Sequence, residues 1–296
     1  MNRHKYRLII PFLFPSVALY VVFVLYPYIS AMYTSLTIWN GYSPHATFVG
    51  LYNFQQMLAN GHFWDALRHN LILLIALPVL DLSIALFFAF LFTQVREGGI
   101  AAKVSQVYRI TYFLPHVMSL VAVAVLWSFV FNPTIGILNS ALSLVGIRGP
   151  TWLGNPSTSL ISVVIVAVWS AVGFYMVLFI AGMQSISKEY YEAGRIDGAN
   201  GWSLFRKITW PLLWDHTRTA LIFVCIGAMD MFALVQVLTE GGPNRSSDVL
   251  ATYLYAAAFK NGEFGYATAL SVTLFGITMV VSAVLLRIGR RDRLEY

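Results

Sequence analysis

The chain has 296 residues, of which 58% are hydrophobic and 11% are charged, and its formal net charge is +6. Soluble domains carry roughly 25% charged residues, so the composition excludes an ordinary soluble domain and indicates an integral membrane protein. The basic residues lie at the ends of apolar runs rather than on one amphipathic face with interleaved aromatics, which argues against a nucleic-acid-binding protein.

Six apolar stretches are long enough to cross a bilayer as helices, which takes roughly 20 residues each. They lie near residues 8–34, 70–94, 108–131, 160–186, 212–238 and 266–288. Only helices and closed barrels satisfy their backbone in lipid, and runs such as ISVVIVAVWSAVGFYMVLFIAG lack the alternation of a barrel strand. The sequence therefore predicts a single all-α membrane domain over residues 1–296 with six transmembrane helices.

The amino-terminal run begins MNRHKYR and stays apolar to about Leu36, which is too long for the core of a signal peptide. We interpret it as an uncleaved first span. With its amino end inside, the outer stretches hold Arg68, Arg148, Arg245 and Lys260. The cytoplasmic stretches then hold Arg3, Lys5, Arg7, Arg96, Lys103, Arg109, Lys188, Arg195, Arg206, Lys207, Arg287, Arg290, Arg291 and Arg293. This excess of basic residues inside predicts that both termini are cytoplasmic.

The chain contains no visible energy source for transport. It has no phosphate-binding G-x-x-x-x-G-K-[ST] loop and no cluster of metal ligands. Inside the apolar runs, the isolated acids Asp81 and Asp230 are either a substrate or proton site or bonded to a neighbouring helix. We interpret Asp81 as structural. Six spans without a motor indicate a pore-forming subunit that another protein drives.

The longest stretch without a strongly apolar window is Glu189 to Trp214, EYYEAGRIDGANGWSLFRKITWPLLW. Ser187 suits a helix cap before Glu189, and Gly198 permits the turn that ends such a helix. Pro211 suits the start of the fifth span. A solvated loop helix and a partner-docking helix fit these residues equally well.

The small side chains in this loop favour close approach by another protein. Tyr190, Ala193 and Asp197 share one helical face, and Ala193 and Gly194 leave room beside it. Glu192 and Arg195 are spaced to pair along another side of the same helix.

The loop also carries the pattern E-A-x-x-x-D-G-A, followed by Phe, Ile and Pro at set distances. The matching residues are Glu192, Ala193, Asp197, Gly198, Ala199, Phe205, Ile208 and Pro211. This pattern resembles the cytoplasmic signature loop of permease subunits in binding-protein-dependent ABC importers. The family often has Ala where this chain has Gly194 and Pro where it has Trp214.

The resemblance extends over nearly the whole chain. The stretches FLFPSVALYVVFVLYPYISAMYTSL, YFLPHVMSLVAVAVLWSFVFNPTIGILN and LTEGGPNRSSDVLATYLYAAAF are similar to the first permease subunit of carbohydrate importers. That group includes maltose, glycerol phosphate and lactose-type systems. It implies a non-catalytic subunit of the bacterial plasma membrane, without a cofactor of its own, that imports a di- or oligosaccharide.

The family also implies the partners. They are a second homologous permease, two copies of a cytoplasmic ATPase that bind ATP and Mg, and an extracytoplasmic sugar-binding protein. The loop would dock on the ATPase as a coupling helix through Tyr190, Glu192, Ala193, Gly194, Asp197, Gly198, Ala199 and Pro211.

A sugar site would lie midway across the fourth and fifth spans, with Trp169, Ser170, Phe174, Tyr175, Asp230, Met231 and Gln236 as candidates. Each candidate has a plainer role in packing or helix bonding. An ion-driven carrier or channel, a membrane-embedded enzyme, and an importer of glycerol phosphate or a polyol are the alternatives.

Overall fold

The computed structural model describes residues 3–93 and 99–288. The predicted end of the second span at Gln94, and the basic residues Arg96, Arg290, Arg291 and Arg293, lie outside the described residues. The chain divides into two compact units, the first comprising Met1–Trp64 with Tyr253–Gly276 and the second comprising Asp65–Thr252 with Ile277–Tyr296.

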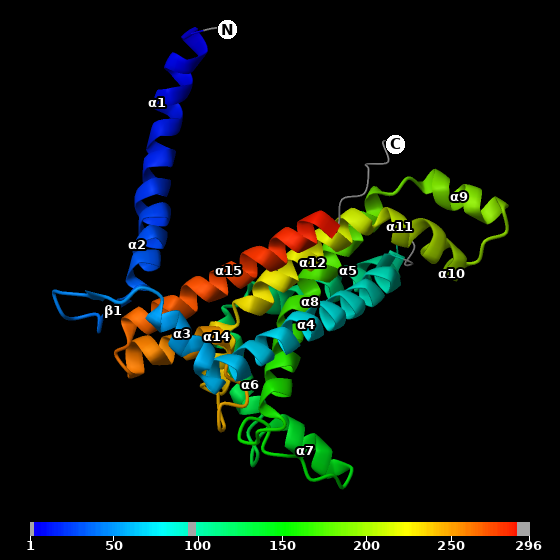
Figure 1. Cartoon of the computed structure of the whole chain (residues 1–296). Coiled ribbons are helices and arrows are strands. Elements are labelled where there is room, and N and C mark those ends of the chain that lie inside the picture. Colours follow the sequence, from blue (N-terminus) through cyan, green and yellow to red (C-terminus); the bar gives the residue numbers. More distant parts are fainter. Residues whose placement is uncertain (1–2, 94–98, 289–296) are drawn as a thin grey trace. The chain divides into compact units, whose positions relative to one another are not determined.

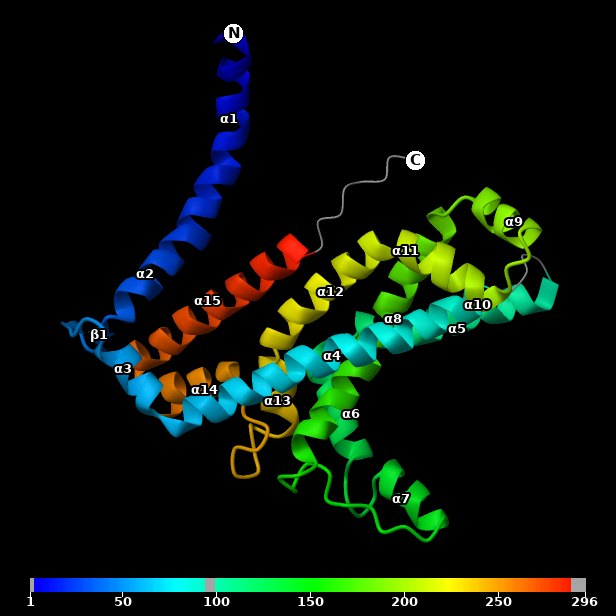
Figure 2. The same ribbon diagram turned by 45° about the vertical axis from the view of Figure 1, so that its right-hand side comes forward.

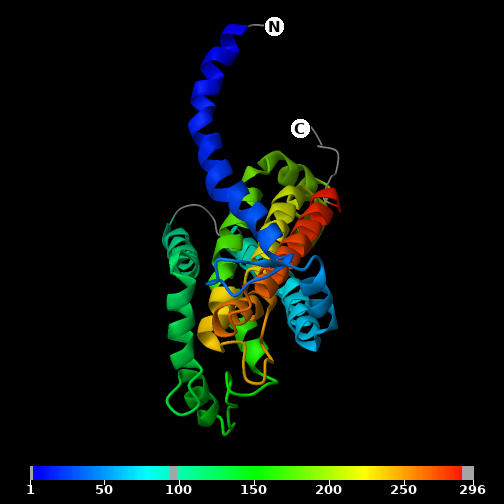
Figure 3. The same ribbon diagram turned by 60° about the vertical axis from the view of Figure 1, so that its left-hand side comes forward.

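The first unit begins with a long helical rod. It consists of α1 (Arg3–Tyr20), the π-helical segment η1 (Val21–Leu25) and α2 (Tyr26–Thr34), which follow one another without a break (Figure 3). Its apolar window from Pro11 to Thr34 has no residue buried within the chain. The rod ends at Thr34, where the sequence places the end of the first span.

A small folded cap follows the rod. Strand β1 (Thr37–Ile38) pairs antiparallel with β2 (Thr47–Phe48), and α3 (Tyr52–Ala59) comes next. The Asn53 amide donates hydrogen bonds to the carbonyls of Ser35 at 2.9 Å and Thr37 at 2.8 Å. These bonds tie α3 to the end of the rod. The two short strands were not expected from the sequence.

Three further elements pass through the first unit. They are α14 (Leu250–Tyr255), the π-helical η3 (Ala256–Lys260) and α15 (Phe264–Ile288). The Tyr253 hydroxyl lies 2.9 Å from that of Tyr266 and accepts a bond from the Asn60 amide, also at 2.9 Å. This network joins α14 to α15 and to the end of α3.

The second unit is a helical bundle around α8 (Ser159–Ser185). Helices α5, α6, α12 and α13 all contact α8, and 67% of its most apolar window is buried (Figure 2). The other elements of this unit are α4 (Gly61–Thr93), α5 (Gly99–Val117), α6 (Leu120–Val130), α7 (Ile137–Leu144), α9 (Lys188–Ile196), α10 (Gly201–Leu204), the π-helical η2 (Phe205–Thr209), α11 (Trp210–Leu212), α12 (Trp214–Met229) and α13 (Phe232–Leu238).

Two glycines let neighbouring helices approach α8. A Cβ on Gly173 would lie 1.8 Å from the carbonyl oxygen of Tyr112 in α5. A Cβ on Gly182 would lie 2.7 Å from the ring of His216 in α12. Small residues at such contacts are how membrane helices gain close van der Waals packing, because lipid supplies no hydrophobic force between them.

Within the described residues, four helices are long and apolar enough to cross a membrane, and two bent pairs raise the number to six. The predicted third span is α5 and α6, bent by 103°, and the predicted fifth is α12 and α13, bent by 47°. The second span also starts earlier than expected, at Gly61 rather than residue 70. Summed hydropathy locates a span but does not register a break inside it or a polar helical extension.

Candidate functional site

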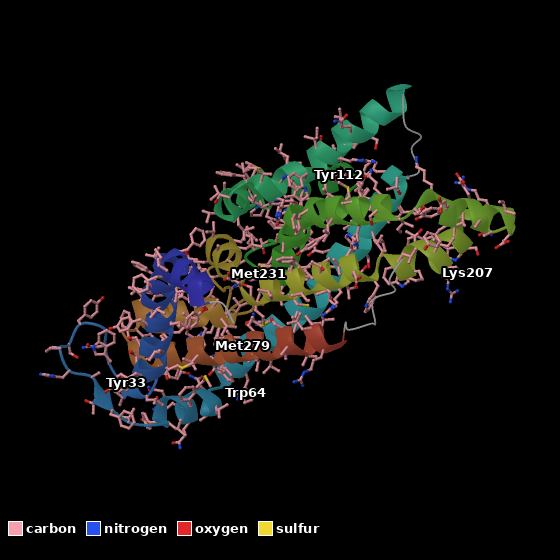
Figure 4. The ribbon with its side chains drawn as sticks, turned by 90° about the horizontal axis from the view of Figure 1, so that it is seen from above. Tyr33, Trp64, Tyr112, Lys207, Met231 and Met279 are labelled. Carbon is pink, nitrogen blue, oxygen red and sulfur yellow. The ribbon has the colours of Figure 1, made fainter. Side chains whose placement is uncertain are left out.

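The fifth span breaks at Asp230, near the middle of the bundle. Asp230 leaves helical geometry with φ −103° and ψ 56°, and its N–H is shared between the carbonyls of Ile226 and Gly227. Helix α13 resumes after Met231, which Figure 4 labels where α12 gives way to α13. Irregular backbone at membrane depth is tolerated where it is buried in protein or lines a cavity, so this break is a candidate functional position.

The third span breaks too, between Val117 and Leu120, where Ser119 has an extended ψ of 131°. The second halves of the two broken spans, α6 and α13, contact each other, and both contact α8. The straight helix α8 is therefore surrounded by both halves of two broken spans. Four of the seven residues predicted for substrate lie on its middle turns.

The four predicted residues of α8 divide into two that contact aromatic rings of other helices, Trp169 and Phe174, and two that are buried, Ser170 and Tyr175. Trp169 is 44% exposed and stands edge-on to Trp127 of α6, with ring centroids 5.5 Å apart. Phe174 stacks on His116 of α5 at 4.6 Å. Trp127 was missed from the sequence because aromatic residues occur in every span and nothing local distinguishes it.

The other two residues point into the chain itself. Ser170 is 8% exposed, and its hydroxyl donates to the carbonyl of Ala167 at 2.8 Å. Tyr175 is 7% exposed. Both side chains are therefore buried, whereas the ring of Trp169 is partly exposed.

On the fifth span, Asp230 is exposed, and Met231 and Gln236 are half-buried. The exposed candidates are therefore Trp169, which contacts α6, and Asp230, which lies at the break of the fifth span. An aromatic face and a carboxylate are groups that can hold a polyhydroxylated ligand by stacking and hydrogen bonding.

The second candidate site is the long loop, whose helix α9 starts and ends as the sequence predicts. The Ser187 hydroxyl accepts a bond from the N–H of Glu189 at 3.4 Å. After the last turn, Gly198 adopts φ +77°. Its N–H donates to the Arg195 carbonyl at 3.0 Å, and the N–H of Ala199 donates to the Gly194 carbonyl at 2.9 Å. These two bonds form a Schellman motif, which needs the positive φ that glycine provides.

Helix α9 is fastened to the segment that leads into the fifth span. The Tyr191 hydroxyl lies 3.1 Å from the Thr209 hydroxyl of η2. A Cβ on Gly194 would lie 2.6 Å from Leu204 Cδ2 and 3.0 Å from Ile208 Cδ1. This packing explains why the chain has glycine at position 194, where the family often has alanine: the side chains of Leu204 and Ile208 fill the space that an alanine methyl group would need.

The outer surface of the loop exposes apolar side chains. Tyr190 is 41% exposed, Ile196 86% and Trp202 68%. Ala193 and Asp197 are also exposed, and Asp197 is the C-cap residue that follows the end of α9 at Ile196. Sequence reasoning missed Ile196 and Trp202, although large apolar residues in a polar loop are a usable signal for a protein interface.

The inner surface of α9 faces the bundle. Lys188, Tyr191, Glu192 and Arg195 recur at helical spacing and line a cavity of about 810 Å³ with residues of α4, α5 and α8. Figure 1 shows α9, α10 and α11 at the end of α8 opposite to α7. Glu192 is exposed but belongs to this inner surface rather than to the outer apolar one.

The segment before Pro211 is helical, not an open loop. Helix α10 begins with the Asn200 side chain accepting from Ser203 N–H at 2.8 Å. The π-helical η2 and α11 follow directly, and Pro211 lies in the first turn of α11. Proline has no N–H to donate, and a π-helical turn before it accommodates the missing bond. Lys207 of this segment projects away from the bundle (Figure 4).

Within residues 3–93 and 99–288, no group of three or more His, Cys, Asp or Glu side chains is placed to hold a metal ion. The two candidate sites are therefore the mid-bundle breaks and the loop, and helix α12 connects them.

Comparison with known proteins gives concordant matches. Residues 65–293 match the family described as binding-protein-dependent transport system inner membrane components. The probable ABC transporter permease YurN of Bacillus subtilis is 34% identical over 298 residues, which cover 100% of both chains. The diacetylchitobiose uptake system permease NgcF of Streptomyces coelicolor is 36% identical over 286 residues, 94% of this chain and 81% of that protein.

A solved structure shows the same fold. The crystal structure of a bacterial ABC transporter involved in import of the acidic polysaccharide alginate contains a chain that superposes with a TM-score of 0.86. The match covers 98% of this chain and 97% of the other at 21% identity.

Proposed function

This chain belongs to the family of binding-protein-dependent transport system inner membrane components, the permease subunits of ABC transporters, and we propose that it forms half of the translocation pathway of a di- or oligosaccharide importer. The sugar class is supported by the diacetylchitobiose permease, which is 36% identical to this chain. A second homologous permease completes the pathway, and an extracytoplasmic binding protein delivers the sugar.

The loop side of the bundle is the cytoplasmic side in this proposal, and both termini are cytoplasmic. The excess of basic residues predicted for that side supports the orientation. Two copies of an ATPase bind ATP and Mg there. The chain itself is a non-catalytic subunit that contributes no cofactor site.

The observation that carries the proposal is the physical connection between the loop and the break in the fifth span. Helix α9 is bonded to η2 through Tyr191 and Thr209, and η2 continues through α11 into α12. Helix α12 ends at Asp230, where the candidate substrate surface begins. In this proposal, a displacement of α9 therefore moves the break, because the Tyr191–Thr209 bond and the segments η2, α11 and α12 connect the two.

Docking on the ATPase uses the outer surface of the loop. Tyr190, Ile196 and Trp202 supply apolar area, and the small Ala193 lets the partner approach the helix. Glu192 lies on the inner surface of α9, but it is exposed, and in this proposal it forms an ion pair with the ATPase that is worth only about 0–1 kcal/mol. Most of the coupling free energy then comes from shape and from the rigidity that Gly194 packing and the Gly198 turn give to the loop.

Transport follows as rocking of the two permeases about the centre of the membrane. ATPase closure moves α9 and tilts α12, while α8 stays as the axis on which both broken spans pack. Trp169 stacks on the sugar and Asp230 accepts its hydroxyl groups. Ser170, Phe174, Tyr175, Met231 and Gln236 shape the surrounding wall.

Co-purification tests the assembly most simply. The tagged chain, expressed with its genomic neighbours, is expected to retain an ATPase and a second permease. The variant Glu192→Lys should keep the second permease but lose most ATP-driven sugar uptake in proteoliposomes. Normal uptake by this variant would remove Glu192 from the coupling role.

The same preparation distinguishes the alternatives. An ion-driven carrier transports when this chain is reconstituted alone with an ion gradient, whereas an importer subunit needs ATP and both partners. A panel of maltose-type disaccharides, polyols and glycerol phosphate then separates a sugar importer from a polyol or glycerol phosphate importer. Uptake of glycerol phosphate alone would overturn the sugar assignment while leaving the importer intact.

A further inference from the structure

The cavity behind α9 is a second site that the transport pathway does not use. Its volume is about 810 Å³, and its walls come from the end of α4, one face of α5, the end of α8, the inner surface of α9 and Thr209 of η2. All these elements belong to the second unit. The cavity lies at the α9 end of the bundle, away from the Asp230 break.

Two hydrogen-bond donors on the α5 wall have no partner among residues 3–93 and 99–288. Ser105 is 5% exposed, and its hydroxyl is buried without a hydrogen bond. Arg109, one helical turn further on, has its Nε buried without a hydrogen bond as well. Buried polar groups are nearly always satisfied in native proteins, so an unpaired donor at a cavity wall indicates a missing acceptor.

The Arg109 side chain is held in place for such an acceptor. Its Nη2 donates to the carbonyl of Phe92 at 2.8 Å, which fixes the guanidinium between α5 and α4. A fixed guanidinium loses little side-chain entropy when a ligand binds. Its planar set of donors also matches the oxygens of phosphate and carboxylate groups.

The charged side chains that line the cavity are mainly cationic. Among the described residues that line the cavity, Arg109 of α5 and Lys188 and Arg195 of α9 are cationic, and Glu192 is acidic. The three cations and one carboxylate leave an excess of positive charge. Cationic side chains in a concave, partly dry site concentrate anions, since the field between them is poorly screened.

We propose that this cavity binds the phosphate group of an anionic ligand, with Ser105 and Arg109 as its hydrogen-bond donors and Lys188 and Arg195 as its counter-charges. The group arrives either on an anionic phospholipid or as a free phosphate compound. Bound there, it bridges α5 to α9, so occupancy of the site sets how firmly the loop is held against the bundle.

Binding is measured directly on the purified complex, so that the result is independent of sugar uptake. The complex is assembled in nanodiscs of phosphatidylcholine with or without phosphatidylglycerol, and bound lipid is counted by native mass spectrometry. A second arm follows thermal unfolding in detergent with inorganic phosphate at constant ionic strength.

The informative variants are Lys188→Gln/Arg195→Gln and Ser105→Ala, with Arg206→Gln as a matched control. Arg206 lies in the same loop but does not line the cavity. Removing both α9 cations should weaken anion binding at least about tenfold, whereas Arg206→Gln should leave it unchanged. Glu192→Gln should strengthen it, because the repelling charge is gone.

The two arms identify the source of the phosphate. Selective retention of phosphatidylglycerol by the wild type assigns a lipid, and stabilisation by inorganic phosphate without lipid retention assigns a soluble ligand. Equal anion binding by the wild type and the double variant overturns the proposal, as does absence of binding in both arms. Either negative result leaves the coupling role of the loop standing.

Discussion

The fourth and fifth spans are both predicted from apolar sequence, yet α8 runs unbroken from Ser159 to Ser185, whereas the fifth span turns by 47° between α12 and α13. The difference lies in a few residues. Helix α8 has no charged side chain, while the fifth span has Asp230 at its turn. An acid at that depth is favoured only where water or polar groups can reach it.

The comparison separates two mechanical roles. The straight span is the surface on which four helices pack, and its glycines bring α5 and α12 close. The broken span receives the loop at one end and carries the candidate substrate residues Asp230, Met231 and Gln236 at the other. Substitutions at the glycines of α8 should therefore affect assembly, and those at the break of the fifth span should affect transport.

The largest effect is expected at Gly173. In Gly173→Ala the new Cβ would meet the Tyr112 backbone at 1.8 Å, and no side-chain rotation relieves that overlap. We expect the free energy of unfolding to fall by about 3 kcal/mol, the upper end for an overpacked core. Thermal unfolding of the purified complex measures it.

Gly227→Ala is the matched control, because nothing lies within 4 Å of a Cβ at Gly227 in α12. Alanine in a helix interior is favoured over glycine by about 0.8–1.0 kcal/mol, so this variant should be slightly more stable than the wild type. If both alanine variants unfold at the wild-type temperature, the close packing of α5 on α8 is wrong.

The next effect is expected at Asp230. Asp230→Leu removes the polar group at the break and should reduce sugar uptake about tenfold or more, which corresponds to about 1.4 kcal/mol. Complex yield should stay near that of the wild type, since Asp230 is exposed. Uptake of labelled sugar in proteoliposomes measures the effect.

Asp230→Asn should retain part of the uptake because an amide still bonds sugar hydroxyls. Asp215→Asn, in the first turn of α12, serves as the control for charge removal on the same helix. Unchanged affinity and transport in Asp230→Leu would remove Asp230 from the substrate site.

An effect of opposite sign, on stability rather than on transport, is expected at Asp81. This side chain in α4 is 1% exposed, and its Oδ1 is buried without a hydrogen bond. Because an unsatisfied buried polar group costs about 1–3 kcal/mol, Asp81→Leu should raise the unfolding temperature and keep uptake. A folded Asp81→Leu complex that fails to transport would assign Asp81 a role in transport instead.

The smallest effect is expected at the bond between α9 and η2. Tyr191→Phe and Thr209→Val each remove one partner of the 3.1 Å hydroxyl contact and should each weaken coupling by about 0.5–1.5 kcal/mol. The double variant should lose no more than either single one. Fully additive losses in uptake per ATP would show that the contact transmits nothing.

The sequence predicts the features that depend on neighbouring residues. The six apolar stretches are found within a few residues of their helices, except at the starts of α4 and α5, which each begin nine residues earlier than predicted. The Ser187 cap and the positive φ at Gly198 are also confirmed. Each of these depends on local chemistry, either transfer into lipid or the conformational freedom of glycine.

The remaining features depend on packing between distant segments. Ser170 and Tyr175 look like site residues by type, but their orientation on α8 is set by the helices that cover it. The 103° bend before α6 depends on how α5 and α6 each pack on α8. The cavity at Ser105 is formed from five elements, and its charge pattern cannot be read from any single stretch.

The most direct test of the central claim, that the loop transmits ATPase motion to the fifth span, is the number of sugars imported per ATP hydrolysed. Gly198→Val places a side chain at φ +77°, whereas Gly201→Ala adds one where nothing lies within 4 Å. Coupling predicts that Gly198→Val retains ATP hydrolysis but imports about tenfold less sugar per ATP, while Gly201→Ala matches the wild type. An unchanged ratio in Gly198→Val would contradict the account.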